Sequence, residues 1–410
     1  MRETVHPQRT AFVLAGGAAR GAYEVGVMQH VIEDVARELG HDIRLDVLCG
    51  TSIGALNVCG LAAFAHLGRA GVGKLVDIWT RLRLGELVRS DTRGILNMGA
   101  RLLGRTRRPD AVPAREGGLL DPAGLEELIE RSVPFERIQH NLDAGLLDAV
   151  TVSTTHVSSG RTVVHVHRRE AALPTWSHDP TTVARAAVIT AQHALASAAI
   201  PILFRAVKLE GDWHCDGGLR QNVPLSPARR LGAGRVLVVN PRYISTTPLD
   251  DGGAEDLFPG PLFVLGKTLN ALLLDRIDND LARLETINRI LEAGTRFAGP
   301  GFVDGLNREM GFADGQGLRP MNALLVRASQ DIGRMAAEFV RSATFGDVGG
   351  LAGRLIRHLA EPESRHEADL LSYLLFDGNF AGQLIELGRA DARARHAELC
   401  AFFAGQHAHA

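Results

Sequence analysis

A serine between two glycines is the first group in the sequence that could do chemistry. Residues 50–54 read GTSIG, with Ser52 between Gly50 and Gly54. Small neighbours let the chain turn sharply and expose the hydroxyl, and the positive end of a following helix favours developing negative charge. This pattern suits a nucleophile that attacks an acyl carbonyl. Taken alone, the pattern fits an ordinary helix N-cap equally well.

A glycine-rich loop precedes this serine in the chain. Residues 16–21 read GGAARG and directly follow an apolar run. Consecutive backbone N–H groups in such a turn, at the start of a helix, bind anions and suit an oxyanion hole. A Walker loop would need a lysine after Gly21, where Ala22 and Tyr23 stand, and the dinucleotide fingerprint fits no register. For Arg20, a structural role is favoured over contact with a phosphate head group.

An aspartate in a glycine turn is the third candidate group. Asp216 is followed by Gly217 and Gly218 and preceded by a strand-like run. By itself, Asp-Gly-Gly is only a turn sequence. A second copy at residues 251–253 lies in a polar segment with no flanking strand. We therefore interpret the second copy as a loop.

Four segments in this order and spacing resemble the patatin-like phospholipase family: LAGGAARGAYEVG, GTSIGALN, ASAAIPILF and DGGLRQNVPL. The resemblance covers about residues 10–240. It implies that Ser52 is the nucleophile and that Asp216 is the acid of a Ser-Asp dyad, supported by Gly50, Gly54, Gly217 and Gly218. It also implies an oxyanion loop built from Gly16, Gly17, Ala18 and Arg20. The family has a glycine where Ala18 stands, and alanine resists a positive φ although it still supplies an N–H.

The resemblance implies a lipid acyl hydrolase that cleaves carboxylic esters of phospholipids or other acyl-ester lipids. Asp216 would accept the proton of Ser52, an acyl-enzyme would form, and water would cleave it. A free aspartate, with a pKa of about 3.9, is a poor base toward a serine hydroxyl, but burial would raise its pKa. We expect neither a metal nor a cofactor.

Two alternatives stay open at this point: an α/β-hydrolase with a Ser-His-Asp triad, and a catalytically idle lipid-binding protein. In α/β-hydrolases the histidine follows the acid along the chain. None of the histidines after Asp216 follows a predicted strand; they are His358, His366, His396, His407 and His409. His214 precedes Asp216 by two residues, and we expect it to pack beside the site.

The elements around these residues predict an α/β fold. Strands over Thr10–Ala15 and Ile43–Cys49 alternate with helices over Ala22–Leu39 and Ile53–Leu67, which is typical of a parallel sheet. The family resemblance implies a three-layer α/β/α arrangement with a mainly parallel central sheet. Further predictions are strands over 149–155, 161–167 and 235–240, a helix over 181–199, a hairpin over 204–215, and helices over 262–292, 321–341 and 351–360.

The predicted organisation is a catalytic domain over 1–242, a linker over 243–261 and a helical C-terminal region over 262–410. Residues 85–120 form a possible insertion or lid within the first domain. Of the 410 residues, 45% are hydrophobic, which is ample for a large core. The net charge of -2 argues against nucleic-acid binding.

Composition also bears on location. The four cysteines show no CxxC spacing, the N-terminus lacks a signal peptide, and no apolar stretch reaches about 18 residues. We therefore expect a cytoplasmic protein with, at most, peripheral membrane contact. Basic residues suited to anionic membrane surfaces gather in the possible lid, with Asp110 against them: Arg101, Arg105, Arg107, Arg108 and Arg115.

Overall fold

The computed structural model describes residues 9–83, 123–170, 172–174, 176, 180–201, 203–244, 277–312, 317–342, 345, 360 and 368–404. Several predictions from the sequence lie outside these residues. They are the possible lid with its arginines, almost all of the linker, the second Asp-Gly-Gly copy, and the helix over 351–360 apart from its last residue.

A sheet of nine strands, within the described residues, runs through the molecule in the order β5-β4-β3-β2-β1-β8-β9, with β7 pairing β3 and β6. The central pairs from β3 to β9 are parallel, whereas β4 and β7 both run antiparallel to β3. The strands are β1 (Arg9–Leu14), β2 (Val47–Thr51), β3 (Ala149–His156), β4 (Thr162–Arg168), β5 (Thr182–Ala186), β6 (Val207–Leu209), β7 (Asp212–Asp216), β8 (Ala233–Asn240) and β9 (Asn322–Arg327).

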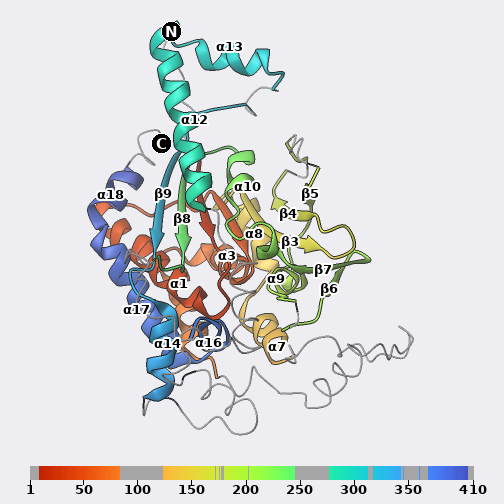
Figure 1. Ribbon diagram of the computed structural model, residues 1–410, viewed down its shortest axis with the longest axis vertical. Helices are drawn as coiled ribbons and strands as arrows, with labels where there is room; N and C mark the ends of the chain where they lie inside the picture. The colour runs from red at the N-terminus through yellow and green to blue at the C-terminus, as the bar shows by residue number, and fades with distance from the viewer. Residues whose placement is uncertain are drawn as a thin grey trace, which may run out of the picture.

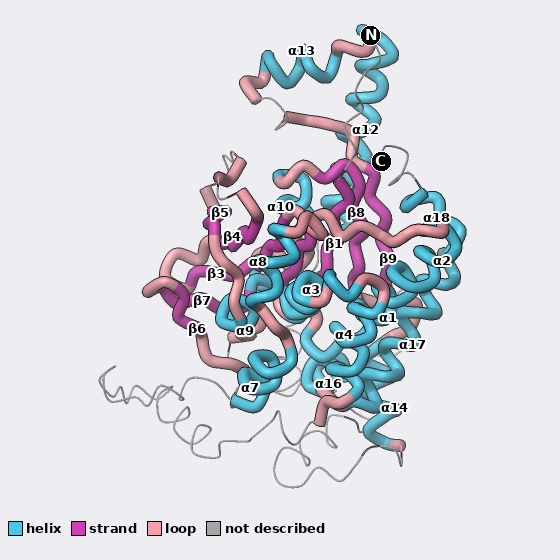
Figure 2. The backbone as a smooth tube through the Cα atoms, turned by 180° about the vertical axis from the view of Figure 1, so that it is seen from behind, coloured by secondary structure: helices cyan, strands magenta, loops and turns pink. Residues whose placement is uncertain are grey.

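Helices cover both faces of the sheet (Figures 1 and 2). Phe12 and Leu14 of β1 pack into one core, with α1, α3 and α17, while Ala11 and Val13 pack into the other, with α10 and α12. This alternation follows from the two-residue period of a strand. Because both faces are buried, β1 and β8 contain continuous apolar runs, Ala11–Leu14 and Val236–Val239. The predicted three-layer α/β/α fold is confirmed.

Helices of the first half of the chain are α1 (Gly21–Gln29), α2 (Ala36–Leu39), α3 (Ile53–Ala63), α4 (Ala70–Thr80), α7 (Ala123–Ser132), α8 (Glu136–Asp143), α9 (Ala191–Ser197) and α10 (Leu225–Arg230). A π-helical segment, η2 (His30–Val35), joins α1 to α2, and 3-10 turns are η1 (Ala18–Arg20), η3 (Ala65–Leu67) and η5 (Gly217–Leu219). The later helices are α12 (Ile277–Ala298), α13 (Phe302–Glu309), α14 (Ile332–Arg341), α16 (Ala368–Leu374), α17 (Gly378–Ala394) and α18 (His396–Ala404).

Two predicted helices were wrong in their first halves. The segment over 181–199 begins as strand β5, parallel to β4, and only α9 is helical. The segment over 321–341 begins as strand β9, which extends the sheet beside β8, and only α14 is helical. In both cases pairing with a neighbouring strand outweighs local helical periodicity. The C-terminal helices are confirmed, and one strand accompanies them.

The C-terminal helices pack directly on the first helix of the chain. Helix α17 crosses α1 so closely that a Cβ at Gly388 would overlap the Tyr23 carbonyl oxygen, and one at Gly26 would overlap the Ile385 carbonyl oxygen. Glycine permits this backbone contact because it has no side chain.

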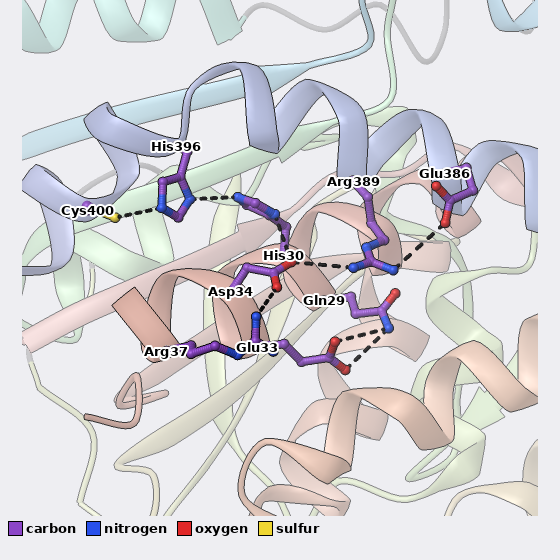
Figure 3. A network of polar contacts seen from close by, with 9 residues as sticks. All are labelled: Gln29, His30, Glu33, Asp34, Arg37, Glu386, Arg389, His396 and Cys400. Carbon is purple, nitrogen blue, oxygen red and sulfur yellow. Dashed lines mark hydrogen bonds and ion pairs between the residues drawn. The ribbon is translucent and has the colours of Figure 1, made fainter. Parts of the chain in front are cut away.

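A polar network reinforces the same junction (Figure 3). His30 of η2 pairs with His396 of α18 (Nε2 to Nδ1, 3.0 Å) and with Asp34 (Nδ1 to Oδ2, 3.1 Å). Arg389 of α17 reaches the Asp34 carboxylate at 3.4 Å, and Cys400 Sγ lies 3.4 Å from His396 Nε2. Helices α17 and α18 therefore belong to the same packed body as α1 and η2.

Within the described ranges, none of the helices combines the length and the apolar character needed to cross a membrane.

We predict that Gly388→Ala lowers the free energy of unfolding by about 1–3 kcal/mol, because the added methyl group overpacks the α1–α17 crossing. Gly382→Ala on the same helix is the matched control, since nothing lies within 4 Å of a Cβ placed there. It should be neutral or slightly stabilising, since alanine is the better helix former. The two thermal midpoints, measured by circular dichroism, check this. Equal midpoints would contradict the close crossing.

Candidate active site

Ser52 lies in a strained turn between β2 and α3. Its φ of 54° and ψ of -126° fall outside the regions that non-glycine residues prefer. A Cβ at Gly50 would overlap Gly54, and one at Gly54 would overlap the Leu14 carbonyl oxygen. The two glycines thus let α3 start directly above β1 and β2. Such strain persists where the surrounding structure enforces it, and it is concentrated at functional sites.

Asp216 ends β7 and faces Ser52. Its Oδ2 accepts a hydrogen bond from Ser52 Oγ at 2.7 Å, and its Oδ1 accepts one from the Gly218 N–H at 2.7 Å. The side chain is fully buried. Burial raises the pKa of Asp216 to about 7, and the hydrogen bonds from Ser52 and Gly218 partly oppose this rise. A carboxyl group with this pKa is a far better base than a solvated aspartate.

Strand β3 and helix α9 hold Ser52 and Asp216 in position. The Ser52 N–H donates to Ser197 Oγ at 2.8 Å, and that hydroxyl donates to the Ser153 carbonyl oxygen at 2.6 Å. Thr155 Oγ1 donates to the Asp216 carbonyl oxygen at 2.8 Å. A Cβ at Gly217 would overlap Ser153. Sequence reasoning missed Ser197 as a site residue, although it lies in the segment ASAAIPILF.

The glycine-rich loop lies against Ser52. A Cβ at Gly16 would lie 3.2 Å from Ser52 Cβ. The Gly16 N–H already donates to the Asn222 carbonyl oxygen at 3.1 Å. Ala18 takes a φ of 48°, the left-handed region in which glycine is usual. Within the described part of the chain, the N–H groups of Gly17 and Ala18 meet no hydrogen-bond acceptor.

Arg20 points toward the C-terminal region. Its Nε donates to Ser372 Oγ of α16 at 2.8 Å, and its guanidinium lies 4.2 Å from the centre of the Tyr373 ring. The side chain is only 6% exposed. A cation–π contact and a hydrogen bond, both shielded from water, fix this end of the loop. Neither contact was foreseen, because α16 carries no sequence motif.

The buried Asn57 side chain connects α3 to α1, the helix that follows the glycine-rich loop. Asn57 Nδ2 donates to the Gly21 carbonyl oxygen at 3.0 Å and to Glu24 Oε2 at 2.8 Å. Asn57 Oδ1 accepts from Trp79 Nε1 at 3.0 Å. Burial raises the pKa of Glu24 well above its usual range. Hydrogen bonds thereby connect α1, which follows the loop, to α3, which follows Ser52.

Among the described residues, no histidine side chain makes a hydrogen bond with the Ser52 or Asp216 side chain. His214 Nδ1 lies 2.9 Å from Thr154 Oγ1, and its ring packs near His165 and His156. Burial lowers the pKa of His214 to about 4, so its imidazole is uncharged at neutral pH. His396 belongs to the network of Figure 3. His358, His366, His407 and His409 lie outside the described residues. No group of three or more potential metal ligands gathers in the described ranges.

Comparisons with known proteins bear on the same residues. The sequence model of the patatin-like phospholipase family matches residues 12–229. VipD from Legionella pneumophila is similar at 13% identity and a TM-score of 0.30, over 93% of this chain and 67% of that one. The type III effector protein ExoU is similar at 14% identity and a TM-score of 0.25, over 93% of this chain and 54% of that one. No curated protein sequence matches this chain.

The family match contains the loop from Gly16 to Arg20, the turn at Ser52 and the turn at Asp216, and it supports a lipid hydrolase activity. Since it also spans more than half of the sequence, the chain belongs to the patatin-like phospholipase family.

Proposed function

We propose that the protein hydrolyses carboxylic esters of phospholipids or other acyl-ester lipids through a Ser52–Asp216 dyad. The observation that supports this most directly is the 2.7 Å hydrogen bond between Ser52 Oγ and a fully buried carboxylate. A nucleophile and a base within hydrogen-bond reach are the minimum for acyl transfer. Family membership supports the lipid substrate.

In the first half-reaction, Ser52 Oγ attacks the ester carbonyl carbon while Asp216 Oδ2 takes its proton. The tetrahedral intermediate collapses, the alcohol leaves with that proton, and an acyl-enzyme remains. In the second half-reaction, Asp216 takes a proton from water as the water attacks the acyl-enzyme. The fatty acid leaves, and Ser52 regains its proton.

The negative charge on the attacked carbonyl oxygen needs preorganised donors. Gly16 is a weaker candidate than expected, because its N–H is already used by Asn222. Arg20 is also weaker, because its side chain is turned toward Ser372 and Tyr373. We therefore assign the donor role to the N–H groups of Gly17 and Ala18. Gly16 and Arg20 then fix the conformation of the loop through their hydrogen bonds.

Ser52→Ala and Asp216→Asn should each abolish hydrolysis of activated esters while leaving the far-ultraviolet spectrum unchanged. Their effects should be non-additive, because both remove the same step. His214→Ala and Asp251→Asn are controls and should retain most of the activity. If folded His214→Ala were as inactive as Ser52→Ala, a Ser-His-Asp triad would replace the dyad. Full activity in either dyad variant would exclude the mechanism.

The pH dependence should follow the ionisation of Asp216. Only the carboxylate form accepts a proton, and burial raises its pKa to about 7. The value of kcat/KM should therefore fall about tenfold per pH unit below pH 7 and level off above it. Initial rates with a substrate that does not ionise in this range, measured from pH 5 to 9, test this. A flat profile down to pH 5 would mean that a group of ordinary aspartate pKa is the base.

The contact of Arg20 with α16 should matter for turnover rather than binding. Tyr373→Leu removes the aromatic face under the guanidinium and should lower kcat about tenfold, with little change in KM, because the loop loses its brace. Tyr373→Phe keeps the ring and should remain close to wild type. Steady-state kinetics on the same ester compare the two. Equal loss in both variants would show that the ring face has no such role.

A further inference from the structure

Three buried histidines lie together on the elements that position the dyad. This histidine cluster consists of His165 of β4, His193 of α9 and His214 of β7, whose exposed fractions are 1%, 8% and 0%. The ring centre of His165 lies 4.8 Å from that of His193 and 5.5 Å from that of His214. Helix α9 also carries Ser197, and β7 ends at Asp216. The cluster and the dyad therefore depend on the same elements.

Thr154 of β3 connects two of the three rings. Its Oγ1 lies 3.1 Å from His165 Nε2 and 2.9 Å from His214 Nδ1, and it donates to the Val163 carbonyl oxygen at 3.3 Å. Because a hydroxyl has only one proton to give, both ring nitrogens must donate to Thr154. The other two nitrogens, His165 Nδ1 and His214 Nε2, meet no hydrogen-bond partner among the described residues. A second proton on either ring would therefore have no acceptor there.

His193 helps to cap α9 through a nitrogen that accepts a hydrogen bond. Its Nδ1 accepts from the Thr190 N–H at 3.2 Å and completes a capping box with the Thr190 side chain. The neutral ring therefore carries its proton on Nε2, which has no partner within the described part of the chain. A second proton, on Nδ1, would oppose the Thr190 N–H and break the cap.

The ionisable groups that face the cluster do little to stabilise charged rings. Asp212 of β7 favours a charge on His214, but its carboxylate also lies 3.4 Å from Arg185 and 3.7 Å from His156. The carboxylate of Asp216 is engaged by Ser52 and Gly218, as described above. The remaining neighbours are basic: His156 of β3, His167 of β4 and Arg185 of β5.

The protonation of the cluster is therefore linked to its exposure. Burial, together with the basic neighbours, lowers the pKa of His165 to about 2 and the pKa values of His193 and His214 to about 4. A histidine in an opened, solvated segment has a pKa of about 6.5. Opening thus takes up about one proton per ring between about pH 4.5 and 6. The closed state loses stability from these rings as the pH falls below about 6.5.

We propose that the histidine cluster is an acid-sensitive switch, in which protonation of the three rings releases β7 and α9 from β3. Release moves Asp216 and Ser197 away from Ser52, because each lies on one of the released elements and bonds to Ser52 in the closed state. The switch is a property of the fold. It does not depend on the reaction that Ser52 performs.

Asp216 acts in the opposite direction, which makes the sign of the pH dependence decisive. Its pKa is about 7 in the closed site and falls to about 3.9 once water reaches it. Opening therefore releases one proton from Asp216, and without the histidines acid would make opening rarer by about tenfold per pH unit. Because the three rings take up three protons, the net uptake is about two. Opening should then become about 100-fold more frequent for each unit of acidification.

Native-state hydrogen exchange measures this opening without relying on activity. The informative amides are the Asp216 N–H, which donates to the Ala199 carbonyl oxygen at 2.9 Å, and the Ser52 N–H, which donates to Ser197. We expect their opening constants, corrected for the intrinsic exchange rate, to rise about 100-fold per unit as the pH is lowered from about 6 to about 4.5. Opening constants that stay level or fall on acidification would overturn the switch.

Two substitutions each remove one titrating ring while keeping its hydrogen-bonding atom. His214→Asn keeps a polar group toward Thr154, and His193→Gln places a usual capping-box residue at the start of α9. Each should reduce the dependence to about tenfold per pH unit, because one proton fewer is taken up. His140→Asn, on the exposed side of α8, is the matched control and should behave as the wild type. An unchanged dependence in both cluster variants would overturn the role of these rings. If the variants did not fold, the wild-type dependence would decide.

The outcomes also separate the switch from the proposed function. A protein that opens with the expected acid dependence but hydrolyses no ester would refute the proposed function and support the switch. An active enzyme whose opening constants fell on acidification would refute the switch alone.

Discussion

A carboxylate held away from water, opposite a serine hydroxyl, is the constraint on which the other features of the site depend. Burial shifts the pKa of Asp216 from 3.8 to about 7. At about 1.4 kcal/mol per unit, ionising this group therefore costs the folded state roughly 4 kcal/mol above pH 7. Because folding raises the pKa of Asp216, the protonated carboxyl group contributes fully to stability below the pKa that this residue has in the unfolded chain. That contribution is lost as the pH rises to about 7. The packing around Asp216 must offset this cost of ionisation.

The packing around Ser52 and Asp216 consists of backbone contacts that only small residues allow. Glycines at 50, 54 and 217 let α3, β1 and β3 approach one another within the space that a side chain would need. Ser197 then satisfies the amide of Ser52 that the sharp turn leaves unpaired. The short sequence motifs of this protein are thus largely steric requirements. Only Ser52 and Asp216 are assigned to the chemistry in the proposed mechanism.

Much of the central sheet and the pairing of Ser52 with Asp216 were predictable from the sequence, because each depends on short local patterns. β1 contains a continuous apolar run, α3 is largely apolar, and Ser52 and Asp216 lie in short motifs. β5 and β9 were not predictable, because their strand character arises from pairing with β4 and β8. Nor were Ser197 and Ser372, whose hydrogen bonds reach partners 145 and 352 residues away. The hydrogen bonds of the Gly16 N–H to Asn222 and of Arg20 to Ser372 likewise appear only in the structure.

The link between Arg20 and α16 also has a consequence for biosynthesis. Ser52 and Asp216 both leave the ribosome long before Ser372 does. At about 5–20 residues per second, the 352 residues that separate Arg20 from Ser372 take roughly 20 to 70 s to translate. During that interval a nascent chain contains Ser52 and Asp216 while its glycine-rich loop lacks the helix that fixes Arg20. The fixed conformation of the loop therefore depends on Ser372 and Tyr373, which are made long after Ser52 and Asp216.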